Sequence, residues 1–183
     1  YISRYDGLYR SLHGKFENMN LLMTDTPPPH SGGVYYDKPA LPRNIRDLCF
    51  DESYNLYLGT DDGDVWILGY SHHGVWVRRI LHGGTDLIGD AVKFMVADRK
   101  GHLWVGTNLG LNLITLPHAA AGNMQANHYH AGKGMPYSNR FYNQQTGYYD
   151  FTGTTAACDH NGNLWIGTDH HLLRVNAHHT PPP

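Results

Sequence analysis

The sequence predicts an all-β fold in which four-stranded antiparallel sheets repeat along the chain as the blades of a β-propeller. The first observation is composition: 21 of the 183 residues are glycine and 13 are tyrosine. Charged residues make up only 16% of the chain, against about 25% in an average domain. The second observation is a short motif that occurs three times. The third is the spacing of its copies, which is close to the size of a propeller blade.

The motif reads Asp-x-x-Gly-(Asn/His)-Leu-Trp-(Ile/Val)-Gly-Thr and is clearest in 98–107 and 159–168. A looser copy occupies 49–60, with tyrosine in place of tryptophan and, in our interpretation, one more residue after its aspartate. The matching glycines Gly59, Gly106 and Gly167 are 47 and 61 residues apart. The first spacing suits a blade. The second predicts an insertion of about 14 residues within 137–153.

Each motif copy is expected to form a tight hairpin turn followed by a strand. Aspartate opens the turn by bonding to the backbone ahead of it, and glycine takes the positive φ that closes it. In the strand that follows, Trp104 and Gly106 share one face. A tryptophan from an adjacent blade lying over the bare backbone would explain glycine there. We therefore expect both repeat tryptophans to be core residues and assign a structural role to the whole set: Asp98, Gly101, Trp104, Gly106, Asp159, Gly162, Trp165 and Gly167.

The segments before the motifs could be read as helices or as strands. Apolar residues in 41–49 and 88–95 have helical spacing. The equivalent segment of the third copy, 151–158, contains three threonines and a glycine, which disfavour a helix. Because equivalent positions should hold the same element, we predict strands in all three.

These residues resemble the two-component regulator propeller repeat, most closely over Gly162–Thr168 and Gly101–Thr107. Gly110-Leu111 is similar to the Gly-Leu that trails this repeat, and Ala40-Leu41-Pro42 is similar to its entry. The resemblance implies the extracytoplasmic sensor of a hybrid histidine kinase, hence a periplasmic or extracellular location. Such sensors carry many more blades, followed by an immunoglobulin-like domain, a membrane helix and a kinase.

The expected blades are roughly 1–40, 41–85, 86–133 and 134–176, with a proline-rich tail at 177–183. Only three of these four units carry the motif, and a closed propeller needs about four blades or more. We therefore expect a minimal propeller, a fragment of a longer protein, or a part that other copies complete.

Aromatic residues outside the motif are the candidates for ligand binding. Trp76 follows the Ser71–Gly74 hairpin tip and is expected to be exposed. Four tyrosines lie in the predicted insertion, and binding residues concentrate on loops. A self-packed loop is the alternative for them. The candidates are Trp76, Tyr137, Tyr142, Tyr148 and Tyr149.

Neither a cofactor nor a metal is predicted. Histidine pairs such as His128 and His130 would share a strand face, but no zinc motif accompanies them. Asp61, Asp62 and Asp64 lack the later glutamate of a calcium loop and are interpreted as a hairpin turn. No catalytic motif occurs, and aspartates that recur with the motif indicate turns rather than a catalytic group.

The leading hypothesis is a non-enzymatic sensor propeller that binds an oligosaccharide. The alternatives are a module that joins further blades or other copies through open blade edges, and a propeller lyase or glycosidase. The acids to inspect for the enzyme are Glu52, Asp86, Asp90 and Asp150. A net charge of −2 argues against a nucleic-acid partner, and no apolar run reaches the roughly 18 residues that membrane insertion needs.

Overall fold

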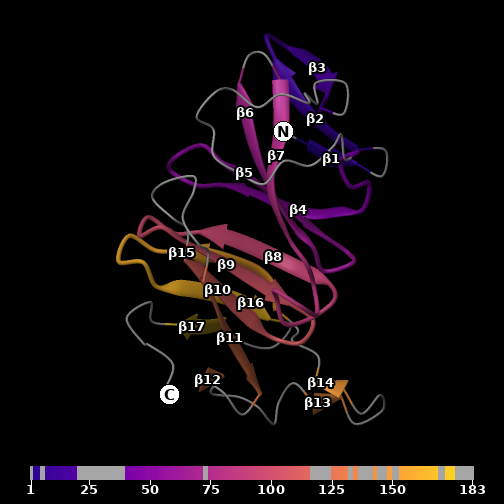
Figure 1. Cartoon of the computed structure of the whole chain (residues 1–183). Helices are drawn as coiled ribbons and strands as arrows, with labels where there is room; N and C mark the ends of the chain where they lie inside the picture. Colours follow the sequence, from indigo (N-terminus) through magenta and orange to yellow (C-terminus); the bar gives the residue numbers. More distant parts are fainter. Residues whose placement is uncertain are drawn as a thin grey trace.

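The computed structural model describes residues 2–4, 7–19, 40–71, 74–115, 125–131, 134–135, 142–143, 148–149, 153–168 and 172–175. Within these residues the chain forms strands and turns, with no α-helix. The predicted all-β fold is confirmed, and the strands form a succession of sheets (Figure 1). None of the described residues forms a helix long and apolar enough to cross a membrane.

Four main sheets follow one another along the chain. The first contains β1 (Ile2–Arg4), β2 (Gly7–Leu12) and β3 (Lys15–Asn18). The second contains β4 (Ile45–Phe50), β5 (Leu56–Thr60), β6 (Val65–Ser71) and β7 (Gly74–Leu81). The third contains β8 (Val92–Ala97), β9 (His102–Thr107), β10 (Leu111–Thr115), β11 (Gln125–Ala131) and β12 (Gly134–Met135). The fourth contains β15 (Gly153–Cys158), β16 (Leu164–Thr168) and β17 (Leu172–Val175).

Neighbouring strands within these sheets are antiparallel, apart from the short parallel pair β11–β12. The third sheet thus has a fifth strand beyond the four expected of a blade. A separate two-stranded sheet joins β13 (Tyr142–Asn143) to β14 (Tyr148–Tyr149). The segments with helical spacing are strands, because β4, β8 and β15 each pair with the strand that carries the motif.

The pairing register shows which position each strand occupies in its sheet. Leu111 on β10 lies opposite Gly106 on β9, and Leu8 on β2 lies opposite Ser3 on β1 in the same way. Glycine precedes both leucines. The first sheet therefore holds the second, third and fourth strand positions of a repeat, with β1 equivalent to β9. The blade boundaries stay a prediction.

The hydrophobic core lies between consecutive sheets in three clusters. Apolar side chains of the first and second sheets pack together, among them Leu8, Leu56 and Leu58. A second cluster joins the second and third sheets through residues such as Tyr57 and Val105. A third joins the third and fourth sheets, with Trp104 against Leu164 and Ile166. Burial between sheets, rather than within any one of them, therefore stabilises the fold.

The described sheets form an open arc. Consecutive sheets contact one another in chain order, through β1 with β4, β4 with β8, and β8 with β15. Among the described residues, no hydrophobic cluster joins the fourth sheet back to the first. Figure 1 shows the first sheet at the upper end of the molecule, away from β16 and β17 in the lower half. Among the described strands, the first and fourth sheets therefore each have one face that no other described sheet packs against.

Candidate functional site

The aspartates of the motif organise the turns at one end of the sheets. Asp98 Oδ1 accepts hydrogen bonds from the backbone N–H groups of Lys100 (2.8 Å) and His102 (2.9 Å). Asp159 Oδ1 does the same for Asn161 and Asn163 at 2.9 Å each. Gly101 and Gly162 close these turns with φ of 80° and 77°.

The second oxygen of each aspartate ties the turn to the strand that follows. Asp159 Oδ2 accepts hydrogen bonds from Asn163 Nδ2 (2.8 Å) and from Trp165 Nε1 (3.0 Å). These two donors hold the pKa of Asp159 below its usual range. In the first copy, Asp51 Oδ2 accepts from Tyr57 OH (2.8 Å). The aspartate therefore joins the turn to the strand aromatic in the first and third copies, whereas in the second copy Asp98 Oδ2 lies 2.9 Å from His102 Nδ1.

The first motif copy differs from our interpretation, because no extra residue follows its aspartate. Asp51 and Gly59 have the same separation as Asp98 and Gly106. Tyr54 stands in place of the turn glycine and adopts φ of 60°. Its side chain is exposed. Because a tyrosine occupies the position of the turn glycine, the sequence alone did not show how the first copy aligns with the other two.

The explanation offered for the strand glycines is also wrong. A Cβ on Gly106 would lie 2.3 Å from the Phe94 ring, which belongs to the neighbouring strand β8 of the same sheet. Only Gly59 is covered from the next sheet, where Val92 Cγ1 would lie 2.6 Å from such a Cβ. Neither glycine is covered by a tryptophan.

Two tryptophans differ from the sequence predictions. Trp76 is buried, with 7% of its surface exposed, because it pairs with Gly69 across β6 and β7 and its indole lies over that bare backbone. Arg78 lies 5.8 Å from the ring centroid. The expected exposure of Trp76 is therefore wrong. Trp104 is a core residue as expected, whereas Trp165 is only half-buried.

The tyrosines of the insertion are described only in part. Tyr142 pairs with Tyr149 across β13 and β14, and Tyr148 pairs with Asn143. Tyr137 lies outside the described residues, as do the histidine pairs His72-His73, His170-His171 and His178-His179. A role for these tyrosines in ligand binding stays a prediction.

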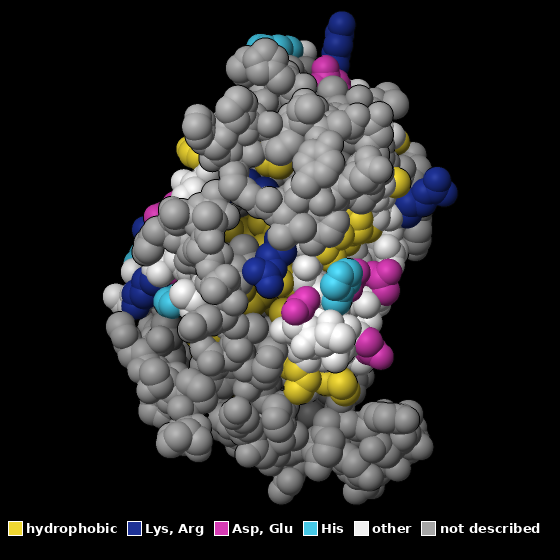
Figure 2. Space-filling model, viewed as in Figure 1, with side chains coloured by type: hydrophobic (Ala, Val, Ile, Leu, Met, Phe, Trp, Pro, Cys, Tyr) yellow, Lys and Arg dark blue, Asp and Glu magenta, His cyan; other side chains and the backbone are white. Residues whose placement is uncertain are grey.

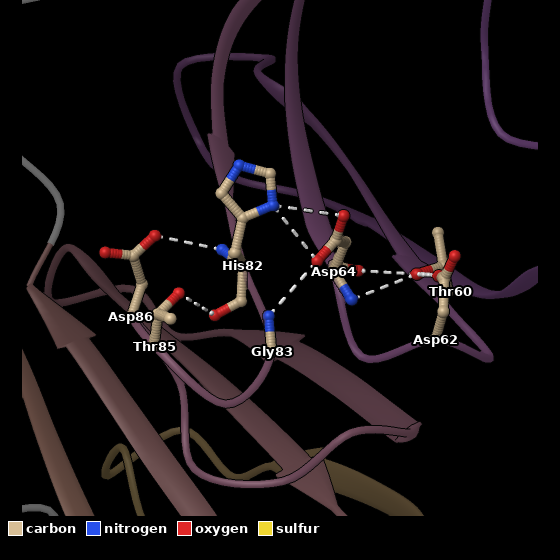
Figure 3. Close-up of polar contacts among 7 residues, drawn as sticks. All are labelled: Thr60, Asp62, Asp64, His82, Gly83, Thr85 and Asp86. Atoms are coloured by element: carbon tan, nitrogen blue, oxygen red, sulfur yellow. Dashed lines mark hydrogen bonds and ion pairs between the residues drawn. The ribbon is translucent and has the colours of Figure 1, made fainter.

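A polar cluster lies where the β5–β6 turn meets the loop after β7 (Figure 3). His82 Nδ1 is 3.3 Å from both carboxylate oxygens of Asp64. The backbone N–H of Gly83 donates to Asp64 Oδ1 at 3.1 Å, and that of His82 donates to Asp86 Oδ2 at 2.9 Å. The His82 side chain is 56% exposed and that of Asp64 is 24% exposed, so solvent reaches the imidazole and part of the Asp64 carboxylate.

The β5–β6 turn is held from the other side by Thr60. The Thr60 hydroxyl bonds to the Asp62 carboxylate and accepts the backbone N–H of Asp64 at 3.0 Å. Gly63 adopts φ of 86° and packs against the backbone of Asp90. Asp61, Asp62 and Asp64 thus form a hairpin turn. Among the described residues, no three His, Cys, Asp or Glu side chains are placed to hold a metal ion.

Buried side chains of the third sheet fix the loop after β7. Asn112 is fully buried and accepts the backbone N–H of Ile88 at 2.8 Å. The Thr107 hydroxyl donates to the Ile88 carbonyl at 2.8 Å. Asn108 bonds to both the backbone and the carboxylate of Asp90. These contacts from another sheet preorganise the polar cluster, a property that suits ligand binding.

We define the loop site as Asp62, Asp64, His82 and Asp86. Acidic side chains gather around a histidine on the face drawn in Figure 2. Such a site can accept hydrogen bonds from hydroxyl groups and bind cationic groups, because its exposed atoms are carboxylate oxygens and an imidazole. Sequence analysis named Asp62, Asp64 and Asp86 separately but missed His82. The signal that could have found it was a histidine at the end of a predicted strand, 18 residues after Asp64.

Of the acids proposed for catalysis, Asp86 and Asp90 lie in the loop after β7, and Glu52 lies in the β4–β5 turn. Glu52 is exposed in the β4–β5 turn, Asp86 binds the His82 backbone, and Asp90 bonds to Asn108. Asp150 lies outside the described residues. No pair of catalytic carboxylates is therefore seen in the described residues.

Comparison with known families identifies the repeat. The two component regulator propeller family matches residues 86–109 and 152–170, which hold the second and third motif copies. These two segments are thus similar to the two component regulator propeller repeat. These regulator propeller repeats coincide with the β8–β9 and β15–β16 hairpins and their aspartate turns.

Among solved structures, the chain is similar to the extracellular domain of a putative hybrid two component system from B. thetaiotaomicron. The two are 18% identical with a TM-score of 0.45, over 74% of this chain and 22% of the other. The chain thus spans less than a quarter of that solved structure. No curated protein matches.

Proposed function

We propose that this chain is a ligand-recognition segment of an extracytoplasmic two-component sensor, with no catalysis of its own. The regulator propeller repeats support the sensor assignment. The expected absence of catalysis is consistent with the aspartates, because those described serve turns and loop contacts. The periplasm or the cell exterior is the location proposed for it.

The ligand proposed is an oligosaccharide bound at the loop site. The observation that carries this proposal is the exposed His82 with Asp64 and Asp86, held in place by backbone donors. Carboxylates and imidazole accept hydrogen bonds from sugar hydroxyls. A loop that is already ordered loses little conformational entropy when it binds a ligand. Trp76 is not part of this proposal, because its ring is buried.

Isothermal titration calorimetry against a panel of neutral and charged oligosaccharides tests the proposal. We expect one glycan class to bind and the His82→Ala variant to lose at least about tenfold in affinity, the loss of one good hydrogen bond. His160→Ala is the matched control, since His160 is an exposed histidine in the β15–β16 turn. A panel without any binder, or binding that both variants weaken equally, would contradict the proposal.

A further inference from the structure

Strand β7 contains a β-bulge that changes which residues share a face. The register with β6 shifts at Arg78, an extra residue that has no partner on β6. Trp76 lies opposite Gly69, and Arg79 lies opposite Ile67. Because Gly69 and Ile67 are two positions apart, they share one face of the sheet, and so do their partners. Trp76 and Arg79 therefore point to the same side, although residues three positions apart in a regular strand point to opposite sides.

The hydrophobic clusters confirm this change of face along β7. Val77, before the bulge, and Ile80, after it, both pack toward the first sheet, although they too are three positions apart. Leu81 packs toward the third sheet. Arg78 turns to the face of Trp76, because its guanidinium is 5.8 Å from the centroid of that ring. The bulge thus gathers both arginines and the tryptophan on the side of the third sheet.

Neither of these arginines has an acidic partner in the described part of the chain. Arginines elsewhere do form ion pairs, such as Arg10 with Glu17 at 2.8 Å. Arg78 and Arg79 are both half-buried. A cation that is partly removed from water without a counter-ion costs free energy. A bound anion would therefore stabilise this face of β7.

Two buried donors at the same place also lack an acceptor. Trp76 Nε1 and Arg78 Nε are buried, and no described residue accepts a hydrogen bond from either atom. Buried donors of this kind are rare in folded proteins and call for an explanation. A carboxylate supplies acceptor oxygens, and its planar shape matches the fork of donors on a guanidinium. Because Arg78 Nε is unbonded, that side chain can turn toward a carboxylate without losing a hydrogen bond there.

We propose that Arg78 and Arg79 bind a carboxylate group, and that the oligosaccharide of the proposed function is therefore an acidic one that contains uronic acids. The second step rests on the proposed function, whereas the first does not. Arg79 lies three residues before His82, about 10 Å along an extended strand, so one oligosaccharide can reach both the arginines and the loop site. The two places take different groups, since the carboxylates of the loop site repel an anion and the arginines attract it.

Nuclear magnetic resonance of the indole N–H groups tests the carboxylate site directly. The chain has four tryptophans, and the Trp76→Phe variant identifies the Trp76 signal. We expect sodium glucuronate to shift this signal, and glucose or sodium chloride at the same concentration to leave it in place. Arg78→Gln and Arg79→Gln should each weaken glucuronate binding at least about tenfold, because each removes a charge-assisted hydrogen bond. Circular dichroism checks that both variants keep the fold.

Arg99→Gln is the matched control, since Arg99 is an exposed arginine in the β8–β9 turn. It removes the same charge and should leave glucuronate binding unchanged. His82→Ala should also keep the glucuronate response. The proposal is overturned if glucuronate causes no shift, if glucose or sodium chloride causes an equal shift, or if Arg79→Gln binds as tightly as the wild-type chain. A response that His82→Ala abolishes overturns it as well, because the carboxylate would then lie at the loop site.

Calorimetry tests the second step with acidic oligosaccharides and with the same compounds after reduction of their carboxylates to alcohols. We expect reduction to weaken binding at least about tenfold, as Arg79→Gln does. Equal binding of the acidic and reduced forms overturns the acidic ligand and leaves the proposed function intact. If no oligosaccharide binds, the proposed function fails and the second step fails with it, whereas the glucuronate response still decides the carboxylate site.

Discussion

At the scale of the residue, Tyr54 adopts a backbone conformation that tyrosine normally avoids. Its φ of 60° falls in the left-handed region, where the two equivalent turn positions hold glycine. A side chain there costs about 1–2 kcal/mol, and the Tyr54 side chain gains little from burial because it is 74% exposed.

Tyr54→Gly should therefore stabilise the chain. We expect a gain of about 0.5–1 kcal/mol in the free energy of unfolding, since glycine also loses more chain entropy on folding. Urea denaturation measures it. Ser53→Gly is the control, because Ser53 is exposed in the same turn without a positive φ. An equal gain from both substitutions would show that the strain at Tyr54 is not the cause.

At Gly106 the constraint is steric, because the Phe94 ring packs directly against the glycine backbone. A Cβ there would lie 2.3 Å from Phe94, a ring that is itself buried. Gly106→Ala should lower the free energy of unfolding by about 1–3 kcal/mol, the usual cost of overpacking. At the equivalent Gly167 the nearest atom is a Thr155 methyl at 3.1 Å. Gly167→Ala should cost clearly less, and the reverse order in thermal denaturation would contradict the argument.

At the scale of the element, strands β4 and β8 are joined by the half-buried carboxylate of Asp47. Asp47 Oδ2 accepts the backbone N–H of Met95 at 2.6 Å, and Oδ1 accepts that of Leu48 at 2.8 Å. Burial raises the pKa of Asp47, and the two backbone donors offset only part of this effect. The charged form is thus disfavoured in the folded protein.

The sign of the pH dependence follows from this raised pKa. The free energy of unfolding of the wild-type chain, relative to that of Asp47→Asn, should be highest below about pH 3.8, the ordinary pKa of an aspartate. Its relative stability should fall as the pH rises through the folded-state pKa. Urea denaturation of both proteins between pH 3 and 8 measures the difference. Asp61→Asn is the control for the loss of a carboxylate, because Asp61 is exposed. If the stability difference between the wild-type chain and Asp47→Asn does not change with pH, the raised pKa of Asp47 is refuted.

Cys49 on β4 and Cys158 on β15 should be poorly reactive thiols. Burial raises the pKa of Cys49 to about 12 and that of Cys158 to about 11. Because the thiolate is the reactive form, both should react with a disulfide reagent at pH 8 far more slowly than in the unfolded chain. The Cys49→Ser and Cys158→Ser variants show which thiol is responsible for each phase of the labelling reaction. Cys158 should be the faster of the two, and rapid labelling of either folded thiol would contradict this.

The strands and turns could be predicted from the sequence because their signals are local. Asp98 and Gly101 lie within one turn, and alternation places Trp104 and Gly106 on one face without knowledge of the rest of the chain. The burial of Trp76 could not be predicted, because it depends on Gly69 on the partner strand. The loop site was missed for the same reason, since Asn112 and Asn108 hold its loop from another sheet.

At the scale of the whole molecule, the arc has three sheet interfaces in series. In such an array each sheet depends on its immediate neighbours for burial, so the same residue type has a different energetic role at the end than in the middle. Sequence repetition alone could not show this, because Trp165 and Trp104 occupy the same motif position. Among the described residues, the fourth sheet covers Trp104, whereas no described sheet follows to cover Trp165.

Leu111 and Leu172 measure that difference directly, since each lies opposite the motif glycine of its own sheet. Leu111→Ala should lower the free energy of unfolding by about 2–5 kcal/mol, because it leaves a cavity between the third and fourth sheets. Leu172→Ala should change it by less than about 0.5 kcal/mol in dilute, monomeric protein, because that side chain is already 69% exposed. Equal costs at both leucines in the dilute monomer would mean that the fourth sheet is covered within one chain, and the arc would then be a closed ring.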